Sequence, residues 1–142
     1  MSYVSEATRE LVRQRAIHSC EYCLSQQKYV FGQFQIDHII PIAKGGEDHE
    51  RNLCLACEMC NQFKWTRTEG TDPQSGNNVG LFNPRQDIWE DHFIWAVDAT
   101  EIIGLTETGR ATVDVLRMNN KLAVTVRKNW CAVGWHPPKS NG

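Results

Sequence analysis

The sequence has no long hydrophobic run. No stretch approaches the roughly 18 consecutive apolar residues that a membrane-spanning helix needs. No basic stretch followed by an apolar one is present near its beginning, which argues against a secretory signal peptide. Internal repeats, apart from a doubled cysteine pair, and low-complexity segments are also missing. These absences argue against membrane-spanning and repeat-array proteins, and we expect a cytoplasmic protein.

An excess of positive charge is missing as well. The formal net charge is −2 and the pI about 6.2, so the overall charge does not indicate a nucleic-acid partner. The charge is unevenly distributed, because residues 1–100 hold nine basic and 14 acidic side chains, whereas residues 101–142 hold six and three. The mildly basic C-terminal part fits either a solvated helix surface or a surface that faces phosphates.

The composition is that of an ordinary folded domain. The chain has 142 residues, of which 41% are hydrophobic and 23% charged. A chain of this length can bury roughly two-thirds of the surface that it exposes when unfolded. We therefore expect one folded domain, with room for an appendage, and no extended disorder.

The six cysteines favour a metal site over disulfides, because a cytosolic chain of this length neither forms nor needs disulfide bonds. Cys20-Glu21-Tyr22-Cys23 and Cys57-Glu58-Met59-Cys60 are two C-x-x-C pairs. This spacing lets two thiolates of a tight turn bind one tetrahedral ion at about 2.3 Å. Cys20, Cys23, Cys57 and Cys60 are therefore predicted to form a four-cysteine structural zinc site, with 33 residues between the pairs.

Three alternatives to this zinc site stay open: another pairing of the cysteines, an iron site, and redox chemistry. Cys54 and Cys57 have the same spacing as Cys57 and Cys60, although the alternating segment around Cys54 favours a buried strand. Cys131 has no partner nearby in the sequence and is expected in the core. The four thiolates could also bind iron in a rubredoxin-like site or serve redox chemistry, because spacing does not identify the metal.

Periodicity and capping residues predict a mixed set of helices and strands. A helix follows Ser5 up to about residue 16, strands lie within 28–40 with an interruption at Gly32, and Lys44 to Asp48 is a loop. Further predicted elements are a strand over 52–56, a helix over 60–66, a polar connector over 68–79, a hairpin over 93–105 that turns near 98–99, a helix over 107–118 after Thr106, and a helix over 120–131. The five tryptophans are expected in the core or between the two parts rather than as platforms for bases.

Several motifs between residues 20 and 66 occur in a distinctive order. They are the two cysteine pairs, Ile36-Asp37-His38-Ile39-Ile40-Pro41, Gly45-Gly46, Asn52-Leu53, Asn61 and Lys64. In this order and spacing, the segment resembles the HNH endonucleases, whose active centre is a two-stranded hairpin and a helix around one metal ion. Residues 81–118 also resemble a C-terminal extension found in some bacterial HNH proteins, which implies no mechanism.

The resemblance implies a role for each of five polar residues. His38 would act as the general base that activates water, a role for which imidazole is the usual side chain near neutral pH. Asp37 and Asn61 would hold a divalent cation, and Asn52 would order the glycine loop and help to orient His38. The ammonium of Lys64 would meet the scissile phosphate or a neighbouring one, although a solvated lysine is an equally simple interpretation.

The expected catalytic metal follows from the ligands. Asn61 stands where many members of the family have a histidine, so the site has oxygen ligands and little nitrogen. Carboxylate and amide oxygens are hard donors, which favour Mg²⁺ or Mn²⁺. His18, His49 and His92 are interpreted as structural or surface residues.

The predicted fold is α+β. It consists of a ββα-metal (His-Me finger) nuclease core stapled by the four-cysteine zinc site, plus a C-terminal extension of a hairpin and helices. The predicted parts are a core with an N-terminal helix over 1–67, a connector over 68–79, and an extension over 80–142 that packs on the core.

The predicted function is metal-dependent hydrolysis of DNA phosphodiester bonds, with nicking as the expected cut. One active centre per chain cuts one strand, so the protein would act as a monomer or a homodimer. RNA stays open as a substrate, because a hairpin-and-helix centre holds the backbone and reads few bases. The alternative function is that of a zinc-stabilised nucleic-acid-binding or scaffold module without catalysis.

Overall fold

A computed structural model describes residues 3–139, so residues 1–2 and 140–142 at the ends of the predicted core and extension lie outside it. The helices are α1 (Glu6–Arg15), α2 (Glu58–Lys64), α3 (Trp89–His92), α4 (Glu107–Val115) and α5 (Lys121–Ala132), with three 3₁₀ turns at Gln27–Tyr29, Ile42–Lys44 and Glu50–Asn52. The strands are β1 (Gln35–His38), β2 (Leu53–Ala56), β3 (Glu69–Thr71), β4 (Asn78–Gly80), β5 (Phe93–Trp95) and β6 (Ile102–Gly104). The fold is thus a mixed α/β domain of short antiparallel strand pairs.

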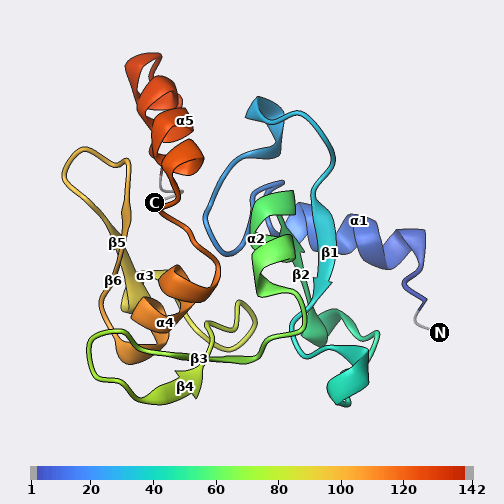
Figure 1. The fold of residues 1–142 in the computed structure, drawn as a ribbon. Helices are drawn as coiled ribbons and strands as arrows, with labels where there is room; N and C mark the ends of the chain where they lie inside the picture. The colour runs from blue at the N-terminus through green and yellow to red at the C-terminus, as the bar shows by residue number, and fades with distance from the viewer. Residues whose placement is uncertain (1–2, 140–142) are drawn as a thin grey trace.

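The N-terminal half is built around the pair β1–β2. These strands are antiparallel, with Asp37 opposite Cys54 and His38 opposite Leu53. Helix α2 packs against both strands and α1 against β2 (Figure 1). Ser5 is the N-cap of helix α1, and its hydroxyl accepts the backbone N–H of Thr8 at 3.1 Å, as the capping pattern predicts. The predicted strand over 52–56 is confirmed as β2, and the predicted helix over 60–66 is confirmed as α2, which begins and ends two residues earlier.

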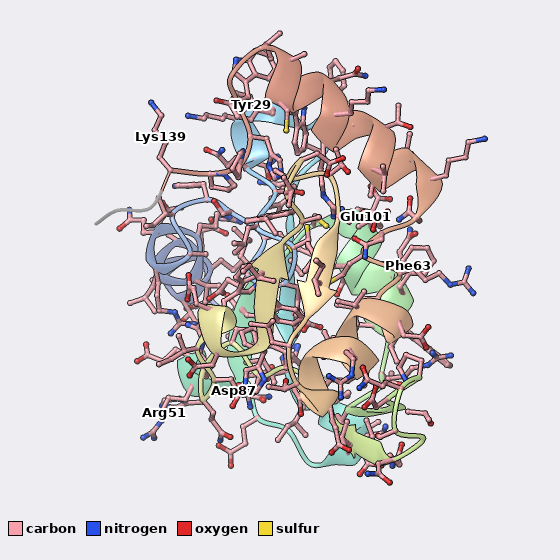
Figure 2. All side chains as sticks on the ribbon, turned by 90° about the vertical axis from the view of Figure 1, so that its left-hand side faces the viewer. Tyr29, Arg51, Phe63, Asp87, Glu101 and Lys139 are labelled. Atoms are coloured by element: carbon pink, nitrogen blue, oxygen red, sulfur yellow. The ribbon has the colours of Figure 1, made fainter. Side chains whose placement is uncertain are left out.

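The expectation of strand structure from residue 28 is wrong. Residues 27–29 form a 3₁₀ turn, and the chain reaches β1 only at Gln35. The side chain of Gln27 holds this segment in a loop, because it donates to Gly32 O and accepts from Phe34 N, both at 2.7 Å. The ring of Tyr29 stacks on Trp135 with ring centroids 4.3 Å apart, near the C-terminal end of α5 (Figure 2). A tertiary contact therefore overrides the alternating pattern.

The stretch that was expected to be a polar connector forms the hairpin β3–β4. Gly70 allows this hairpin to pack on α4, because a Cβ at that position would lie 2.6 Å from Cγ2 of Val115. The hairpin β5–β6 and the helices α4 and α5 occur where the sequence predicts them, with Thr106 as the N-cap of α4. Asn120 caps α5.

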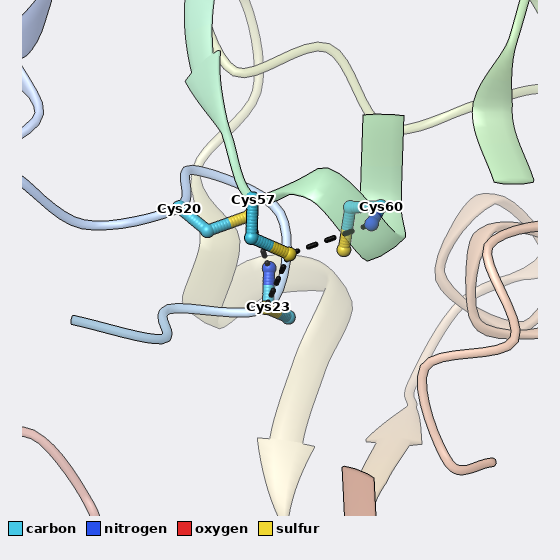
Figure 3. Close-up of side chains that lie close together, drawn as sticks. All are labelled: Cys20, Cys23, Cys57 and Cys60. Atoms are coloured by element: carbon cyan, nitrogen blue, oxygen red, sulfur yellow. Dashed lines mark hydrogen bonds between the residues drawn. The ribbon is translucent and has the colours of Figure 1, made fainter. Parts of the chain in front are cut away.

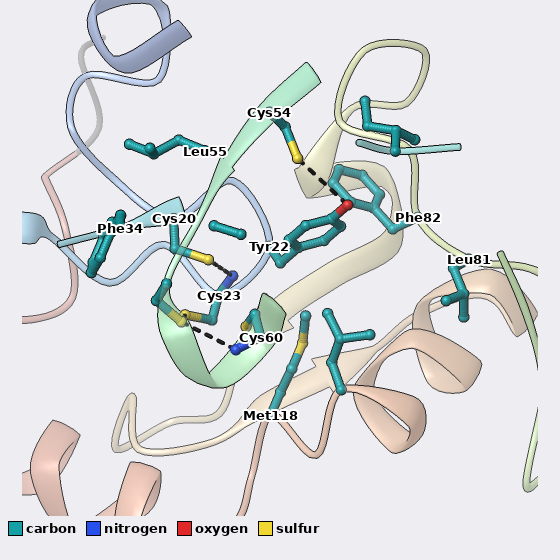
Figure 4. Close-up of a cluster of buried hydrophobic side chains, with 14 of the residues drawn as sticks. Cys20, Tyr22, Cys23, Phe34, Cys54, Leu55, Cys60, Leu81, Phe82 and Met118 are labelled. Carbon is teal, nitrogen blue, oxygen red and sulfur yellow. Dashed lines mark hydrogen bonds between the residues drawn. The ribbon is translucent and has the colours of Figure 1, made fainter. Parts of the chain in front are cut away.

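One cluster of buried side chains includes residues of both halves, among them Tyr22 and Leu55 from the first and Phe82 and Met118 from the second (Figure 4). Two polar contacts reinforce this packing at the first cysteine pair. The indole N–H of Trp89 donates to Tyr22 O at 2.8 Å. The guanidinium of Arg85 pairs with Glu21, which also accepts the backbone N–H of Leu55 at 2.8 Å. The C-terminal half is therefore docked directly against the segment that carries the cysteines.

Asp72, in the turn of the β3–β4 hairpin, anchors this hairpin to α4. Its carboxylate is fully buried and accepts two hydrogen bonds from the guanidinium of Arg110, each of 2.9 Å. A bidentate pair of this kind fixes both distance and orientation. The hydrogen bonds from Arg110 hold the pKa of Asp72 well below its usual range.

This pair predicts a pH dependence of stability. Because the pKa of Asp72 is lower in the folded chain than in the unfolded chain, the pair stabilises the fold at neutral pH, and this contribution is lost as the pH falls below about 4. Asp72→Asn should therefore be less stable than the parent at pH 7 and should lose less stability on acidification. Urea unfolding of both proteins along a pH series measures the difference. Identical slopes of unfolding free energy against pH in the two proteins would contradict this assignment.

Candidate nuclease site on a four-cysteine frame

The four predicted zinc ligands come together. The sulfur atoms of Cys20, Cys23, Cys57 and Cys60 lie within 4.8 Å of one another, and all four residues are buried (Figure 3). The sulfur atoms of Cys23 and Cys57 are 3.7 Å apart. An edge of a tetrahedron with metal–sulfur bonds of about 2.3 Å is about 3.8 Å long, so this spacing fits a zinc ion. The cluster joins the turn at residues 20–23 to the junction between β2 and α2.

The surroundings of the sulfur atoms also fit a cation. Backbone N–H groups donate to two of them, from Cys23 to Cys20 at 3.5 Å and from Cys60 to Cys57 at 3.4 Å. Burial raises the pKa of the Cys20 thiol well above its usual value, whereas hydrogen bonding to the neighbouring sulfur atoms lowers that of Cys23. Because the pKa of Cys20 is raised and that of Cys23 lowered, the buried sulfur atoms do not all ionise on their own; four thiolates would need a compensating positive charge, which a bound zinc ion would supply.

The structure separates the other two cysteines from this cluster. Cys54 is fully buried on β2, with its sulfur 3.5 Å from the hydroxyl of Tyr22. Figure 4 marks this contact with a dashed line. The alternative pairing of Cys54 with Cys57 is therefore wrong. Cys131, which was expected in the core, is only partly buried, and its thiol lies 3.7 Å from Asp98 O.

His38 lies at the end of β1 with one-fifth of its side chain exposed. Its Nε2 is 2.7 Å from Oδ1 of Asp48, in the loop that follows the two glycines. The other carboxylate oxygen of Asp48 accepts the backbone N–H of Tyr3 at 3.0 Å. Within residues 3–139, Nδ1 of His38 has no hydrogen-bond partner, so this nitrogen is the one that can meet a water molecule or a substrate.

The loop between β1 and β2 is held in place by Asn52. Its amide oxygen accepts the backbone N–H of Ile40, and its amide nitrogen donates to the carbonyls of Ile40 and Glu47, all at 2.9 Å. Gly46 makes this close approach possible, because a Cβ there would lie 1.7 Å from Ile40 O. The side chain of Asn52 thus holds the loop that carries Asp48, and Asp48 in turn forms a hydrogen bond with His38.

Asp37 points to the opposite side of β1 from His38 and is buried, with only 5% of its surface exposed. The ammonium of Lys64 lies 3.0 Å from its Oδ2 and 3.3 Å from its Oδ1, and it also donates to His38 O at 3.1 Å. The hydroxyl of Tyr22 donates to Oδ2 at 2.8 Å. Burial raises the pKa of Tyr22 well above its usual range, so the hydroxyl keeps its proton as a donor.

These positions differ from the expected arrangement in two ways. Lys64 is neither solvated nor directed outward to a phosphate, because its side chain is buried against Asp37. Asp37, expected in an open pocket, is enclosed by its partners. Asn61 is half-buried on α2, one turn before Lys64, so the helix brings the two residues to one face.

Two residues of the site were missed from the sequence. Tyr22 lies between two predicted zinc ligands, and nothing in that motif indicates its bond to Asp37. Asp48 lies in a loop of acidic and polar residues, where any of several carboxylates could have met His38. Both contacts depend on tertiary structure and leave no spacing signal.

Comparison with known proteins agrees with this site. Residues 20–67, about a third of the chain, match the sequence model of the HNH endonuclease family. The matched segment begins at the first cysteine of the cluster and ends just after α2, so it contains every residue described above as part of the site. The resemblance to HNH endonucleases is thereby confirmed for this segment, and the match indicates nuclease activity in general terms. Searches of curated proteins and of solved structures give no significant match. Among the described residues, no helix is long and apolar enough to cross a membrane.

Proposed function

We propose that this protein is an endonuclease that hydrolyses phosphodiester bonds of DNA and nicks one strand at a time. The observation that carries the proposal is the position of His38. Its imidazole is partly exposed, bonded to a carboxylate on one side and open on the other, within a segment that matches the HNH family. RNA is the alternative substrate, which the same backbone chemistry would accept.

Asp48 supports the assignment of His38 as the general base. An ionised carboxylate can only accept hydrogen bonds, so Nε2 of His38 must carry the proton that lies between them. The neutral ring then has its lone pair on Nδ1, where it can take a proton from water. In the proposed step, the water oxygen bonds to phosphorus, the bond from phosphorus to the leaving sugar oxygen breaks, and Nδ1 receives the proton of the water.

Asp37 and Asn61 would hold the catalytic cation, which the family implies. Both offer oxygen donors suited to Mg²⁺ or Mn²⁺, and both lie on elements that pack together, β1 and α2. When bound, the cation would neutralise charge that builds on the phosphate and the leaving oxygen. The carboxylate of Asp37 is bonded to the ammonium of Lys64, so a cation competes with Lys64 for it.

This competition predicts the effect of Lys64→Met on cation binding. Removing a positive charge 3.0 Å from the carboxylate should strengthen Mn²⁺ binding at least about tenfold, because two like charges this close repel each other even in a partly screened site. Binding is measured by the loss of the free Mn²⁺ signal in electron paramagnetic resonance. The matched control is Lys44→Met, an exposed lysine on the loop after β1. Equal or weaker binding by the Lys64 variant would speak against Asp37 as a cation ligand.

The proposed function is tested with supercoiled plasmid in Mg²⁺, in Mn²⁺ and without an added divalent cation. A nicking endonuclease converts the plasmid to the relaxed circle first, and linear product appears only later from independent cuts. Cleavage should occur only with an added cation. Intact plasmid under all three conditions, with a zinc-loaded and folded protein, would refute the proposal.

A second candidate is the zinc-stabilised nucleic-acid-binding or scaffold module. One observation favours it: Asp37 is enclosed by Lys64, Tyr22 and Cys54, which resembles a structural polar cluster more than an open metal pocket. Such a module would bind the plasmid and leave it uncut. The plasmid assay therefore separates the two functions directly.

A further inference from the structure

Trp65 has an unusual backbone conformation and an unusual exposure. It follows α2 directly, with φ 50° and ψ −119°. The backbone N–H of Arg67 donates to Lys64 O at 2.9 Å, which closes a β-turn with Trp65 at its first central position. These angles are those of a type II′ turn, in which this position is normally a glycine. Nevertheless, the position holds the largest side chain, and 74% of its surface is exposed.

The turn lies beside the candidate catalytic residues. Lys64, the residue before Trp65, donates from its ammonium to His38 O at 3.1 Å. The C-terminal end of α2 therefore lies at the end of β1 that carries His38, and Figure 1 shows both ends at the same side of the strand pair. Arg67, two residues after Trp65, is exposed and forms no ion pair with any residue in the range 3–139. An exposed indole and an exposed guanidinium thus belong to the turn that directly follows Lys64, whose ammonium contacts His38 O.

A contribution to the stability of the fold does not explain why a tryptophan occupies position 65. A tryptophan in a glycine conformation is strained, and little of its surface is buried to compensate for that strain. The sequence-based expectation that the tryptophans lie in the core or between the two halves is wrong for this residue. Strained backbone of this kind persists mainly where it positions a functional group. An exposed aromatic ring with a neighbouring cation is the combination that binds single-stranded nucleic acid through stacking and phosphate contact.

We propose that Trp65 is a DNA-binding residue whose indole stacks on an unpaired base beside the phosphate that is cut. The substrate would then be a DNA single strand or a duplex that is locally unpaired at the cut, a state that negative supercoiling of a plasmid favours. This inference rests on the proposed function, because it assumes that the site holds DNA. Intact duplex offers no free base face, since its bases stack on one another.

The experiment measures binding without cleavage. The parent for binding is the His38→Ala protein, with fluorescence anisotropy of a short labelled single strand and of the corresponding duplex. Trp65→Gly should weaken binding of the single strand about tenfold or more, and binding of the duplex much less. Trp65→Phe should keep most of the affinity because it keeps an aromatic face. Phe31→Ala, which removes a fully exposed aromatic ring from the segment before β1, is the matched control and should bind as the parent does.

Thermal unfolding tests whether misfolding causes the weaker binding of the single strand by Trp65→Gly. Glycine relieves the strain at this turn, so Trp65→Gly should melt at a temperature equal to or a few degrees above that of the parent while it binds the single strand more weakly. Equal affinity of parent and Trp65→Gly for the single strand, or equal losses on single strand and duplex, would overturn the stacking proposal while leaving the nuclease proposal in place. If the parent binds neither DNA, both proposals fail.

Discussion

His38→Ala should lower the rate of DNA cleavage by about 10²–10⁴, the usual contribution of a positioned general base. The substitution removes both ring nitrogens of a partly exposed imidazole that lies next to the carboxylate of Asp48 and has no hydrogen-bond partner at Nδ1 within residues 3–139. The rate is measured in single-turnover reactions with an excess of protein over labelled DNA. His38 touches none of the four cysteine sulfurs, so the variant should keep its zinc and its fold.

Asp48→Asn separates the positioning of the His38 ring by residue 48 from the proton transfer that His38 itself performs. The amide can still bond the imidazole, but it can also donate, so it no longer fixes the proton on Nε2. The rate should fall less than in His38→Ala and should depend differently on pH. A variant that cleaves like the parent across the pH range would remove Asp48 from the mechanism and leave the assignment of His38 to be decided by His38→Ala.

Removal of the zinc ion should unfold the N-terminal half of the protein. Structural zinc contributes about 10–16 kcal/mol to the folding of small zinc domains, which is comparable with the whole stability of a typical domain, about 5–15 kcal/mol. The four cysteines also join the turn at residues 20–23 to the start of α2, and no disulfide in the range 3–139 shares this task. Cys23→Ser should therefore lose the bound zinc, the part of its helical circular dichroism signal that comes from α1 and α2, and its cleavage activity.

The matched control for this prediction is Cys131→Ser. Cys131 is a free, partly buried cysteine outside the cluster, so the variant should bind one zinc ion per chain and melt like the parent. Elemental analysis and thermal unfolding give both results. A Cys23→Ser protein that is as stable as the parent would show that the thiolate cluster is not the frame of this domain. Iron in place of zinc in the parent would instead support the rubredoxin-like alternative.

Local signals in the sequence predicted much of the fold. Ser5 and Thr106 cap helices where the sequence indicates, because capping depends on a side chain and a backbone group three residues apart. The two C-x-x-C pairs predicted a cluster that brings together segments 33 residues apart, since each pair defines half of a tetrahedral site. The helix caps and the cysteine pairs depend on residues three positions apart, and such spacings can be read directly from the sequence.

The parts that could not be predicted depend on contacts between distant segments. Residues 30–34 were predicted as part of a strand but form a loop. The two hydrogen bonds formed by the side chain of Gln27 that hold this loop leave no pattern in the sequence. The enclosure of Asp37 by Tyr22 and Lys64 depends on how the cysteine turn and α2 meet β1. Spacing and the family resemblance therefore predicted five polar residues of the candidate site, but they gave no sign of Tyr22 or Asp48 and did not indicate which residues are buried.

The most direct test compares nicking of supercoiled plasmid by the parent and by His38→Ala, purified in parallel and each shown to hold one zinc ion per chain. We predict that the parent produces relaxed circles at a rate that rises with added Mg²⁺ or Mn²⁺, whereas the variant leaves the plasmid supercoiled over the same period. Equal rates of nicking by the two preparations, or no nicking by the zinc-loaded parent, would contradict the proposal that this protein hydrolyses DNA with His38 as the general base.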